Sequence, residues 1–452
     1  MNSVQEIAEQ FVNKLLSTRL EEGLTTVVAH MEQAVKDYLP SLFSAVAEVA
    51  EQGIFNSEHR RKNYEVVRSD VRVVETTIGT IRFKRRYYRH KKTAEYVYLL
   101  DRMLQLEPRE RIDKGLAAAL CTEATDCSYR KAAKKVSDGR VSGQTVLTLM
   151  KRVCENPVPV QEVRNHVQVI HIQCDEDHVA LQQPHRRSIV KLAVIHEPVR
   201  HRGKRAYLPH RFALTSTPLE SNEDFWLRIA QAIDDRYGLR DDLQVYIHGD
   251  GAAWIKSGLD WIAGSRFVLD LFHLNSYVRK VSSHYDSMFR GLWYALRNDD
   301  LSLLRELTLA AVDMELCHEE TATALFRYVK ANRQGIRIQL KDGVVTIGSC
   351  AEGLVSHLLS DRLSSRPKAW REPGLESMSR LRVHCANGGP LTARDFASKT
   401  PPKPLQKHMA KEISDYVFDL MPAPTEVFRH AKRGTWIHRY FDSIKDAGMK
   451  FA

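Results

Sequence analysis

The chain has 452 residues, with 67 Lys and Arg against 56 Asp and Glu, a formal net charge of +11 and 43% hydrophobic residues. This length predicts more than one domain, and the ordinary globular composition excludes a chain that is disordered throughout. No apolar run is long enough to span a membrane and the first residues lack the pattern of a secretory signal, so we expect a cytoplasmic protein with no membrane partner.

The positive charge is concentrated in two segments. Residues 57–110 carry 14 basic and 8 acidic residues, and residues 362–452 carry 17 and 9, which leaves the rest of the chain slightly acidic. A basic balance of this size indicates a polyanionic partner only weakly. The seven cysteines are scattered and form no CxxC pair, which argues against a disulfide scaffold or a zinc ribbon and predicts reduced thiols.

Residues 1–55 are predicted to form an N-terminal helical region, because apolar residues recur there at spacings of three to four. Residues 56–112 are predicted to form a basic β-ribbon, because β-branched residues alternate with polar ones. The stretch from Arg82 to Lys92 holds seven basic and three aromatic residues. This charge either protects an exposed edge strand or follows DNA phosphates, with rings that stack on bases. The candidate DNA contacts are Arg82, Lys84, Arg85, Arg86, Arg89, Lys91 and Lys92.

Residues 113–157 are predicted to form a helix-turn-helix-like DNA-binding region of three short helices. The third helix begins after Ser142, a residue type that caps helix N-termini. The residues expected to face inward are Val146, Leu147, Met150 and Val153. The residues expected to face a DNA groove are Gln144, Thr145, Thr148, Lys151 and Arg152. An ordinary helical hairpin is the alternative.

Residues 158–372 are predicted to form an α/β catalytic domain. The expected elements are strands at 167–181, 188–196 and 206–216, a helix capped by Ser221 and ending near Tyr237, a strand at 243–248, a helix at 252–262 and a strand at 266–271. Three strands followed by alternating helices and strands predict a mixed sheet with right-handed crossovers, in the order of a ribonuclease H-like fold.

The chain after this sheet is predicted to be helical over residues 273–332, with an all-helical insertion at about 285–335. A strand hairpin is then expected from Gly335–Leu340 to Val344–Ile347, followed by a helix that starts near Ala351. Residues 373–452 are predicted to form a basic C-terminal region, with an extended linker at 399–404 and a helical tail from Lys407.

Carboxylates occupy special places in this plan. Asp175 and Asp177 share a face of the first strand, and Asp250 lies between two glycines after the fourth. Glu352 lies in the first turn of a helix, beside its apolar face. A buried carboxylate must be paired, protonated or bound to a metal. If the three positions converge, they would hold two Mg²⁺ ions, with Mn²⁺ as a substitute, and carry out phosphoryl transfer.

Simpler explanations exist for two of these acids. Gly249-Asp250-Gly251 is also a common turn sequence, and an acidic residue such as Glu352 is favourable at any helix N-terminus.

Four segments carry a resemblance to a known family: Cys174–Gln182, Ile247–Ile255, Leu269–Leu274, and Glu352-Gly353 with Ser356, His357 and Arg362. On these residues the chain resembles the ISLre-two family of insertion-sequence transposases, which are bacterial DDE transposases related to the Mutator-like group. The resemblance implies Asp175, Asp250 and Glu352 as the catalytic and metal-binding triad, with Asp177 as a further ligand or the alternative first acid. It also implies an accessory role for His273, either structural or in phosphate contact.

The expected function is therefore that of a bacterial insertion-sequence transposase. It would bind the element ends, hydrolyse a phosphodiester and transfer the freed strand to target DNA, as a homo-oligomer on double-stranded DNA and associated with the nucleoid. Two alternatives remain open: a ribonuclease H-fold nuclease or resolvase that does not transpose, and a catalytically inactive DNA-binding regulator.

Overall fold

The computed structural model describes residues 3–17, 21, 23–153, 162–183, 185–238, 240–341, 350–366, 368–389, 391–397 and 403–420. The chain forms two compact units. Unit 1 comprises Met1–Ala124, Ser128–Val146 and Leu391–Ala452, and unit 2 comprises Thr125–Cys127 and Leu147–Pro390. None of the described helices has the length and apolar character needed to cross a membrane.

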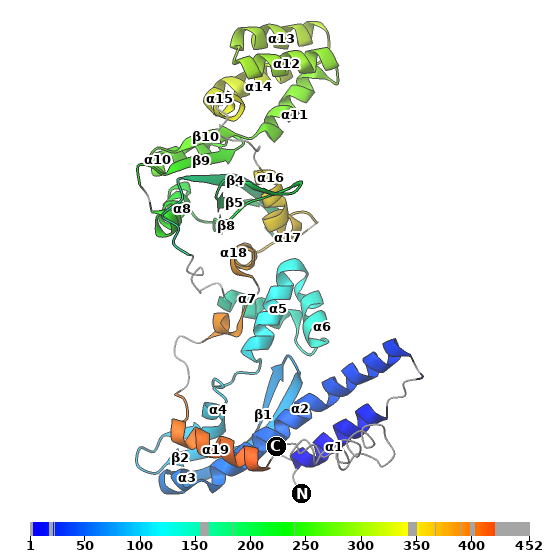
Figure 1. The fold of residues 1–452 in the computed structure, drawn as a ribbon, viewed down its shortest axis with the longest axis vertical. Helices are drawn as coiled ribbons and strands as arrows, with labels where there is room; N and C mark the ends of the chain where they lie inside the picture. Colours follow the sequence, from blue (N-terminus) through cyan, green and yellow to red (C-terminus); the bar gives the residue numbers. More distant parts are fainter. Residues whose placement is uncertain are drawn as a thin grey trace. The chain divides into compact units, whose positions relative to one another are not determined.

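The first third of the chain contains helices and one antiparallel ribbon, as predicted (Figure 1). Its elements are α1 (Ser3–Leu16), α2 (Leu24–Asn56), α3 (Glu58–Asn63), β1 (Tyr64–Thr76), β2 (Gly79–His90), β3 (Tyr96–Tyr98), α4 (Leu99–Met103), α5 (Lys114–Asp126), α6 (Tyr129–Ser137) and α7 (Gly143–Val153). Unit 1 also contains a short 3-10 helix, η3 (Ala393–Phe396), and α19 (Lys407–Leu420).

Helix α2 covers the β2 strand. Where β2 lies beyond the short β3 strand, its backbone N–H groups donate to α2: Arg82 N to Ser44 Oγ at 3.0 Å and Lys84 N to Glu48 Oε1 at 3.1 Å. Helix α19 adds Met409 to the same apolar cluster as α2. The ribbon edge is therefore protected by helix contacts rather than by charge alone. The predicted tail beyond Leu420 lies outside the described residues.

Unit 2 is built on a mixed five-stranded sheet in the order β10-β9-β4-β5-β8. Strands β10, β9 and β4 are parallel, whereas β5 is antiparallel to β4 and to β8. The strands of this sheet are β4 (Val169–Ala180), β5 (Arg187–His196), β8 (Phe212–Thr215), β9 (Gln244–Gly249) and β10 (Arg266–Leu269). Two further strands, β6 (Arg200–Arg202) and β7 (Arg205–Tyr207), form a separate two-stranded sheet. The mixed sheet is thus confirmed, with four of its five strands close to the predicted bounds.

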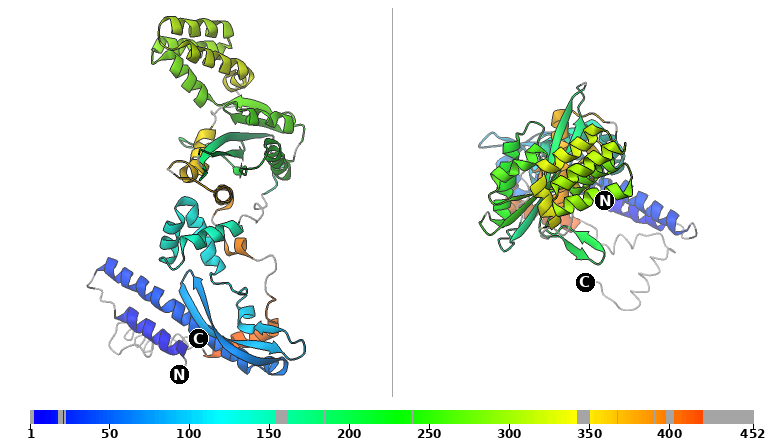
Figure 2. Two further views of the ribbon diagram at one scale, coloured as in Figure 1. Left: turned by 180° about the vertical axis from the view of Figure 1, so that it is seen from behind. Right: turned by 90° about the horizontal axis from the view of Figure 1, so that it is seen from above.

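The helices of unit 2 lie on the sheet and beyond its β10 edge (Figures 1 and 2). They are α8 (Asn222–Tyr237), α9 (Ala253–Lys256), α10 (Gly258–Trp261), α11 (Leu271–Ser282), α12 (Asp286–Asn298), α13 (Leu301–Asp313), α14 (Glu319–Ala331), α15 (Arg333–Lys341), α16 (Ala351–Val355), the π-helix η2 (Ser356–Ser360), α17 (Asp361–Leu363) and α18 (Glu372–Gly388). The predicted helical region at 273–332 is confirmed. Buried residues of β4, α8 and α11–α14 form one continuous apolar cluster.

Three predicted elements of unit 2 are wrong. The single strand expected at 206–216 is divided, because Pro209 cannot donate to a strand ladder, and its first part pairs in a separate hairpin, β6–β7. The helix expected at 252–262 is two short helices, α9 and α10. The strand expected at 335–340 is helix α15, whose Ile336 and Ile338 are both buried. The expected strand at 344–347 lies outside the described residues.

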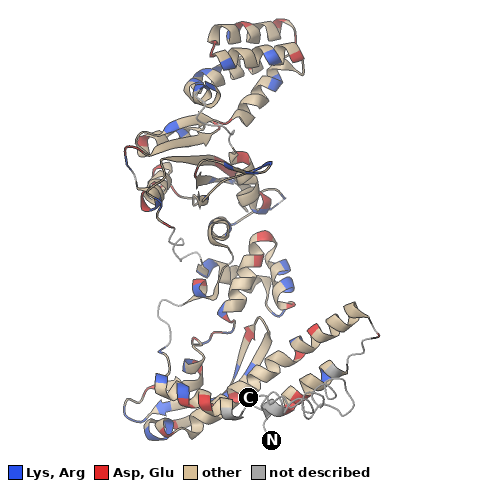
Figure 3. Ribbon diagram, in the orientation of Figure 1, with Lys and Arg blue, Asp and Glu red and all other residues tan. Residues whose placement is uncertain are grey.

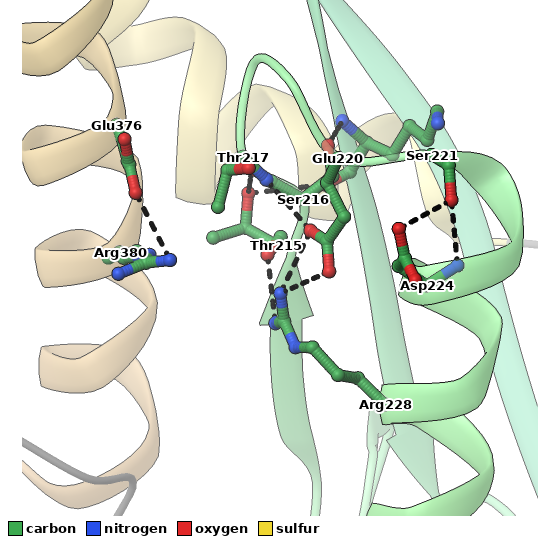
Figure 4. A network of polar contacts seen from close by, with 10 residues as sticks. Thr215, Ser216, Thr217, Glu220, Ser221, Asp224, Arg228, Glu376 and Arg380 are labelled. Carbon is green, nitrogen blue, oxygen red and sulfur yellow. Dashed lines mark hydrogen bonds and ion pairs between the residues drawn. The ribbon is translucent and has the colours of Figure 1, made fainter.

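A polar network fixes the connection from β8 to α8 (Figure 4). Arg228 Nη1 donates to both carboxylate oxygens of Glu220, at 2.7 and 2.9 Å, and Arg228 Nη2 donates to Thr215 O. Ser221 Oγ accepts from Asp224 N at 3.0 Å and caps α8, as predicted. These contacts connect the edge strand β8 to helix α8, which follows it in the chain.

We expect Gly258→Ala to destabilise unit 2. Gly258 is buried against Trp226, and a Cβ atom built on it would overlap the indole ring. Overpacking of a tight core costs about 1–3 kcal/mol. Thermal unfolding measures the effect, with Gly353→Ala as the matched control, because no atom lies within 4 Å of its added Cβ. An unchanged unfolding midpoint for Gly258→Ala would contradict the packing described here.

Candidate active site

The three consecutive acids of β4 are held in different ways. Glu176 accepts a hydrogen bond from the Trp254 indole and pairs with His178 at 3.2 Å. Asp177 is buried and accepts from Ser364 Oγ at 2.7 Å. Within the described residues, the hydrogen bond that Asp175 accepts comes from its own neighbour: Glu176 N donates to Asp175 Oδ1 at 2.8 Å. Of the three acids, Asp175 is therefore the one whose carboxylate forms no hydrogen bond or ion pair with a side chain elsewhere in the described part of the chain.

Asp175 lies in the electrostatic field of the other two predicted acids. Its pKa is raised from 3.8 to about 7, chiefly because burial disfavours the charged form. The negative charges of Glu352 and Asp250 raise the pKa further, while the Glu176 N–H and His273 lower it. Glu352 and Asp250 therefore lie near enough to Asp175 for their charges to affect its pKa. Because Ser364 holds Asp177, this arrangement favours Asp175 as the first acid.

Asp250 follows directly on β9, level with Asp175. The parallel pairing of β4 with β9 places Gln173 opposite His248, two residues before each of these acids. The Asp250 side chain accepts from Ala252 N at 2.9 Å, and its backbone carbonyl accepts from Tyr328 Oη at 2.6 Å. Asp250 is therefore anchored at the end of its strand by α14.

The glycines beside Asp250 have a structural role. A Cβ on Gly249 would stand 2.6 Å from Ile255 Cδ1, and one on Gly251 would stand 2.5 Å from Asn332 Oδ1. Gly251 also has a φ of +94°, which disfavours other residues. The two glycines thus leave room for the side chains of Ile255 and Asn332.

Glu352 is exposed in the first turn of α16, beside the buried Leu354 and Val355. The helix is attached to β4 at its start, since Cys350 N donates to Gln173 Oε1 at 3.2 Å. Gln173 lies two residues before Asp175 on the same face of the strand. This contact places the Glu352 turn over the part of β4 that carries Asp175.

His273 is a basic group in this acidic site. Asp270, buried at the N-cap of α11, accepts from Phe272 N at 2.8 Å and lies 3.7 Å from His273 Nδ1. The pKa of His273 is raised, first by Asp270, while burial opposes the shift and the charges of Asp250 and Asp175 add to it. The proximity of Asp270 at the cap of α11 supports a structural role for His273, and a contact with phosphate stays a prediction.

A row of buried histidines lies on the sheet next to the acids, and the sequence reading missed it. His171 Nδ1 is 3.0 Å from His248 Nε2, and His196 Nε2 is 3.2 Å from Gln173 Nε2. Burial lowers the pKa of all three rings, that of His171 to about 4, because it disfavours the charged form of each ring. The signal was present in the sequence, because His171, Gln173 and Asp175 alternate along one strand face.

An open groove of about 570 Å³ runs along α11. Its lining residues share one helix face and are Phe272, Asn275, Ser276, Arg279, Lys280, Ser283 and His284. Phe272 is 62% exposed and packs edge-on against His273. The groove therefore starts beside the acidic site and becomes basic along the helix.

The donor chemistry of the three acids fits magnesium, although their geometry is not that of a closed metal site. Within the described residues, no three His, Cys, Asp or Glu side chains lie close enough together to hold one ion. The oxygen donors are of the type that Mg²⁺ prefers.

The basic ribbon of unit 1 retains few unpaired cations. Arg85 is buried, pairs with Asp101 and stacks on Tyr98, while Arg86, Arg89 and Lys91 contact α2, Glu65 and the Arg61 carbonyl. The remaining candidates are exposed, and no ion pair of theirs occurs in the described part of the chain: Arg82, Lys84 and Lys92. Figure 3 shows acidic and basic residues interspersed along these elements.

The aromatic residues of the ribbon are used internally. Phe83 and Tyr88 are buried, and Tyr88 donates to Glu51 at 2.7 Å. Tyr87 stacks on Tyr96, with ring centroids 5.4 Å apart. The expectation that Phe83 and Tyr88 stack on bases is therefore wrong.

The three helices predicted at 113–155 are present as α5, α6 and α7. In α7 the inward residues Val146, Met150 and Val153 are buried and Leu147 is half-buried, as expected. Of the predicted groove residues, Thr145 is half-buried and bonds to Ser142, and the others are exposed: Gln144, Thr148, Lys151 and Arg152.

The comparisons with known proteins find members of one family. Residues 17–400 match the profile described as "Uncharacterised protein family (UPF0236)". A UPF0236 protein of Caldanaerobacter subterraneus subsp. tengcongensis is 33% identical over 403 residues, which are 88% of this chain and 85% of the relative. Another from that organism is 33% identical over 380 residues, 83% and 81% of the two chains, and its name joins eleven locus designations. A UPF0236 protein of Streptococcus gallolyticus, named for its place in the vanSb 3′ region, is 26% identical over 354 residues, 74% and 76%.

Proposed function

The chain belongs to the UPF0236 family, and from its carboxylate site we propose that it is a metal-dependent DNA transposase with Asp175, Asp250 and Glu352 as the catalytic acids. The observation that carries the proposal is the placement of the acids: the parallel register brings Asp250 level with Asp175, and the contact of Cys350 N with Gln173 places the Glu352 turn over the same part of β4. The three acids belong to a strand, a strand end and a helix, and they are 75 and 102 residues apart in the sequence.

The strand order supports the same proposal. Numbered along the chain, the five strands of the main sheet lie in the order 3-2-1-4-5, with the second antiparallel to its neighbours. This is the topology of ribonuclease H-like folds, and we propose that fold for unit 2. In an open sheet of this kind, acids at the carboxyl ends of the central parallel strands form the site, as Asp250 does after β9.

Asp175, Asp250 and Glu352 would have to move closer together than in this structure to hold two Mg²⁺ ions, for which Mn²⁺ would substitute. Bound at such a site, the ions activate the attacking oxygen and stabilise the leaving oxygen of a phosphodiester. The chain's own residues would orient the reactants. Tyr328 holds the Asp250 carbonyl, and His273, whose pKa is raised beside Asp270, would contact a phosphate that enters between the acids.

The relatives add an independent argument. A name that joins eleven locus designations describes one protein sequence found at many places in one genome. Copies that insert at new positions produce such a distribution, whereas a housekeeping nuclease or a regulator needs only one locus.

The decisive experiment is a strand-transfer assay. The full chain is incubated with Mg²⁺, a labelled duplex that carries the inverted repeats flanking its gene, and an unlabelled target duplex. We expect cleavage at the repeat ends and joined products, both abolished by a chelator. Cleavage without joining would contradict the proposal and favour a nuclease. Binding with neither reaction would contradict it and favour an inactive regulator.

A further inference from the structure

The β6–β7 hairpin is a small, strongly basic surface between β5 and β8. All residues of both strands are exposed, and Gly203-Lys204 forms the turn between them. The base of the hairpin is closed by Glu197 N, which donates to the Pro209 carbonyl at 3.2 Å. The hairpin contains four Lys and Arg and no acidic residue: Arg200, Arg202, Lys204 and Arg205.

The register places the arginines on one face of the hairpin. Arg200 and Arg202 are two residues apart on β6, so they point to the same side. Arg205 lies directly opposite Arg202, and Tyr207 lies opposite Arg200. Directly opposite residues share a face, so all four side chains project from it. The other face carries only His201 and Ala206.

This arrangement costs stability when the hairpin is free. Like charges directly opposite each other, as at Arg202 and Arg205, are destabilising, and an isolated two-stranded hairpin is marginal in water. Within the described residues none of the four cations forms an ion pair or a side-chain hydrogen bond. The fold therefore presents uncompensated charge where a polyanion would neutralise it.

We propose that this arginine face binds the phosphate backbone of duplex DNA, a step that rests on the proposed function only in taking DNA as the substrate. Guanidinium groups donate in pairs to phosphate oxygens. Alternate residues of a strand lie about 6.6 Å apart, close to twice the ~3.4 Å axial spacing of phosphates along one DNA strand. A two-stranded ribbon also fits the wide major groove of B-form DNA, whereas that groove is deep and narrow in duplex RNA.

The hairpin is a separate contact from the acidic site. It leaves β5 after His196, which pairs with His171, whereas Asp175 pairs with Leu192 nearer the middle of the strand. The hairpin would thus hold DNA beyond the reacting phosphate, where the carboxylates do not repel it.

The test compares two triple variants of the full chain. One replaces Arg200, Arg202 and Arg205 by Gln. The matched control replaces three exposed residues of α13 and α14 by Gln, with the same change in charge: Arg305, Arg327 and Lys330. Binding of a labelled duplex of arbitrary sequence is measured by fluorescence anisotropy over a range of salt concentrations without divalent ions, so no catalytic step is involved.

For the hairpin variant we expect the slope of log Kobs against log salt to become shallower by about 2.7, roughly 0.9 for each lost phosphate contact. Affinity near physiological salt should fall at least about tenfold. The control triple should bind like the wild type, and the corresponding Lys triple should keep the slope with weaker binding. Equal unfolding midpoints establish that the variants are folded.

Several outcomes would overturn the inference: an unchanged slope for the hairpin variant, an equal loss in the control triple, or tighter binding of duplex RNA than of DNA. Failure of the inference is distinguishable from failure of the proposed function. A wild-type chain that joins strands while the hairpin variant binds normally refutes only the hairpin site. A chain that binds duplex DNA through the hairpin but never cleaves it refutes only the transposase.

Discussion

Asp250→Asn is expected to abolish DNA cleavage and strand transfer, with a loss of at least about 1000-fold in rate. The substitution keeps the acceptor for Ala252 N and the contact of the backbone carbonyl with Tyr328, so the loop after β9 should be unchanged. It removes one anionic oxygen from the metal site. Metal stabilisation of a phosphoryl-transfer transition state amounts to several kcal/mol, and each 1.36 kcal/mol is tenfold in rate.

The controls for this prediction come from the same unit. Asp260→Asn changes an exposed carboxylate of α10 and should leave the rate unchanged. Asp175→Asn should lose activity as Asp250→Asn does, whereas Asp177→Asn should lose less, because Ser364 donates to it and can donate to the amide oxygen as well. Single-turnover cleavage of a labelled duplex measures all four. More than a tenth of the wild-type rate in Asp250→Asn would refute the catalytic assignment.

Asp175→Asn is expected to make the metal-free protein more stable, although less active. The pKa of Asp175 is about 7 in the fold, against 3.8 for the ordinary side chain, so the fold favours the protonated form. The folded state then binds more protons than the unfolded state between these values, and stability falls as the pH rises from about 4 to about 7. With allowance for solvent screening, Asn should add about 2 kcal/mol to the free energy of unfolding near pH 8.

Denaturant unfolding in a chelator at several pH values measures this gain, which should shrink as the pH is lowered from 7 towards 4. Adding Mg²⁺ near pH 8 should stabilise the wild type, because an ion that binds only the folded state stabilises it, and should stabilise Asp175→Asn far less. Asp260→Asn again serves as the control. An Asp175→Asn variant less stable than the wild type near pH 8 would contradict the raised pKa of Asp175.

The sequence was sufficient where a pattern has one structural solution. Asp175 and Asp177 share a face in any strand, and Ser221 and Asp224 form a helix cap by local geometry alone. Residue spacing also placed Asp250 at the end of its strand, and the parallel register with β4 then brought it level with Asp175.

The sequence did not predict the structure correctly where one local pattern fits two structures and tertiary contacts decide between them. Ile336 and Ile338 alternate as in a strand, yet both are buried from a helix, because α15 packs closely on β10. The sequence suggests that Arg85 is a free cation. In the structure it forms an ion pair with Asp101 and stacks on Tyr98, two residues that lie outside the strand that carries it. No local rule reports these partners.

The contacts of α14 with the loop after β9 set a rule for redesign of the helical insertion. Tyr328 holds the Asp250 carbonyl, Asn332 fills the space beside Gly251, and Lys256 Nζ donates to the Ala331 carbonyl at 3.1 Å. None of these contacts comes from α12 or α13. A chain shortened in α12 and α13 would keep the geometry of Asp250, whereas a deletion that takes α14 would remove the contacts that hold the loop around Asp250.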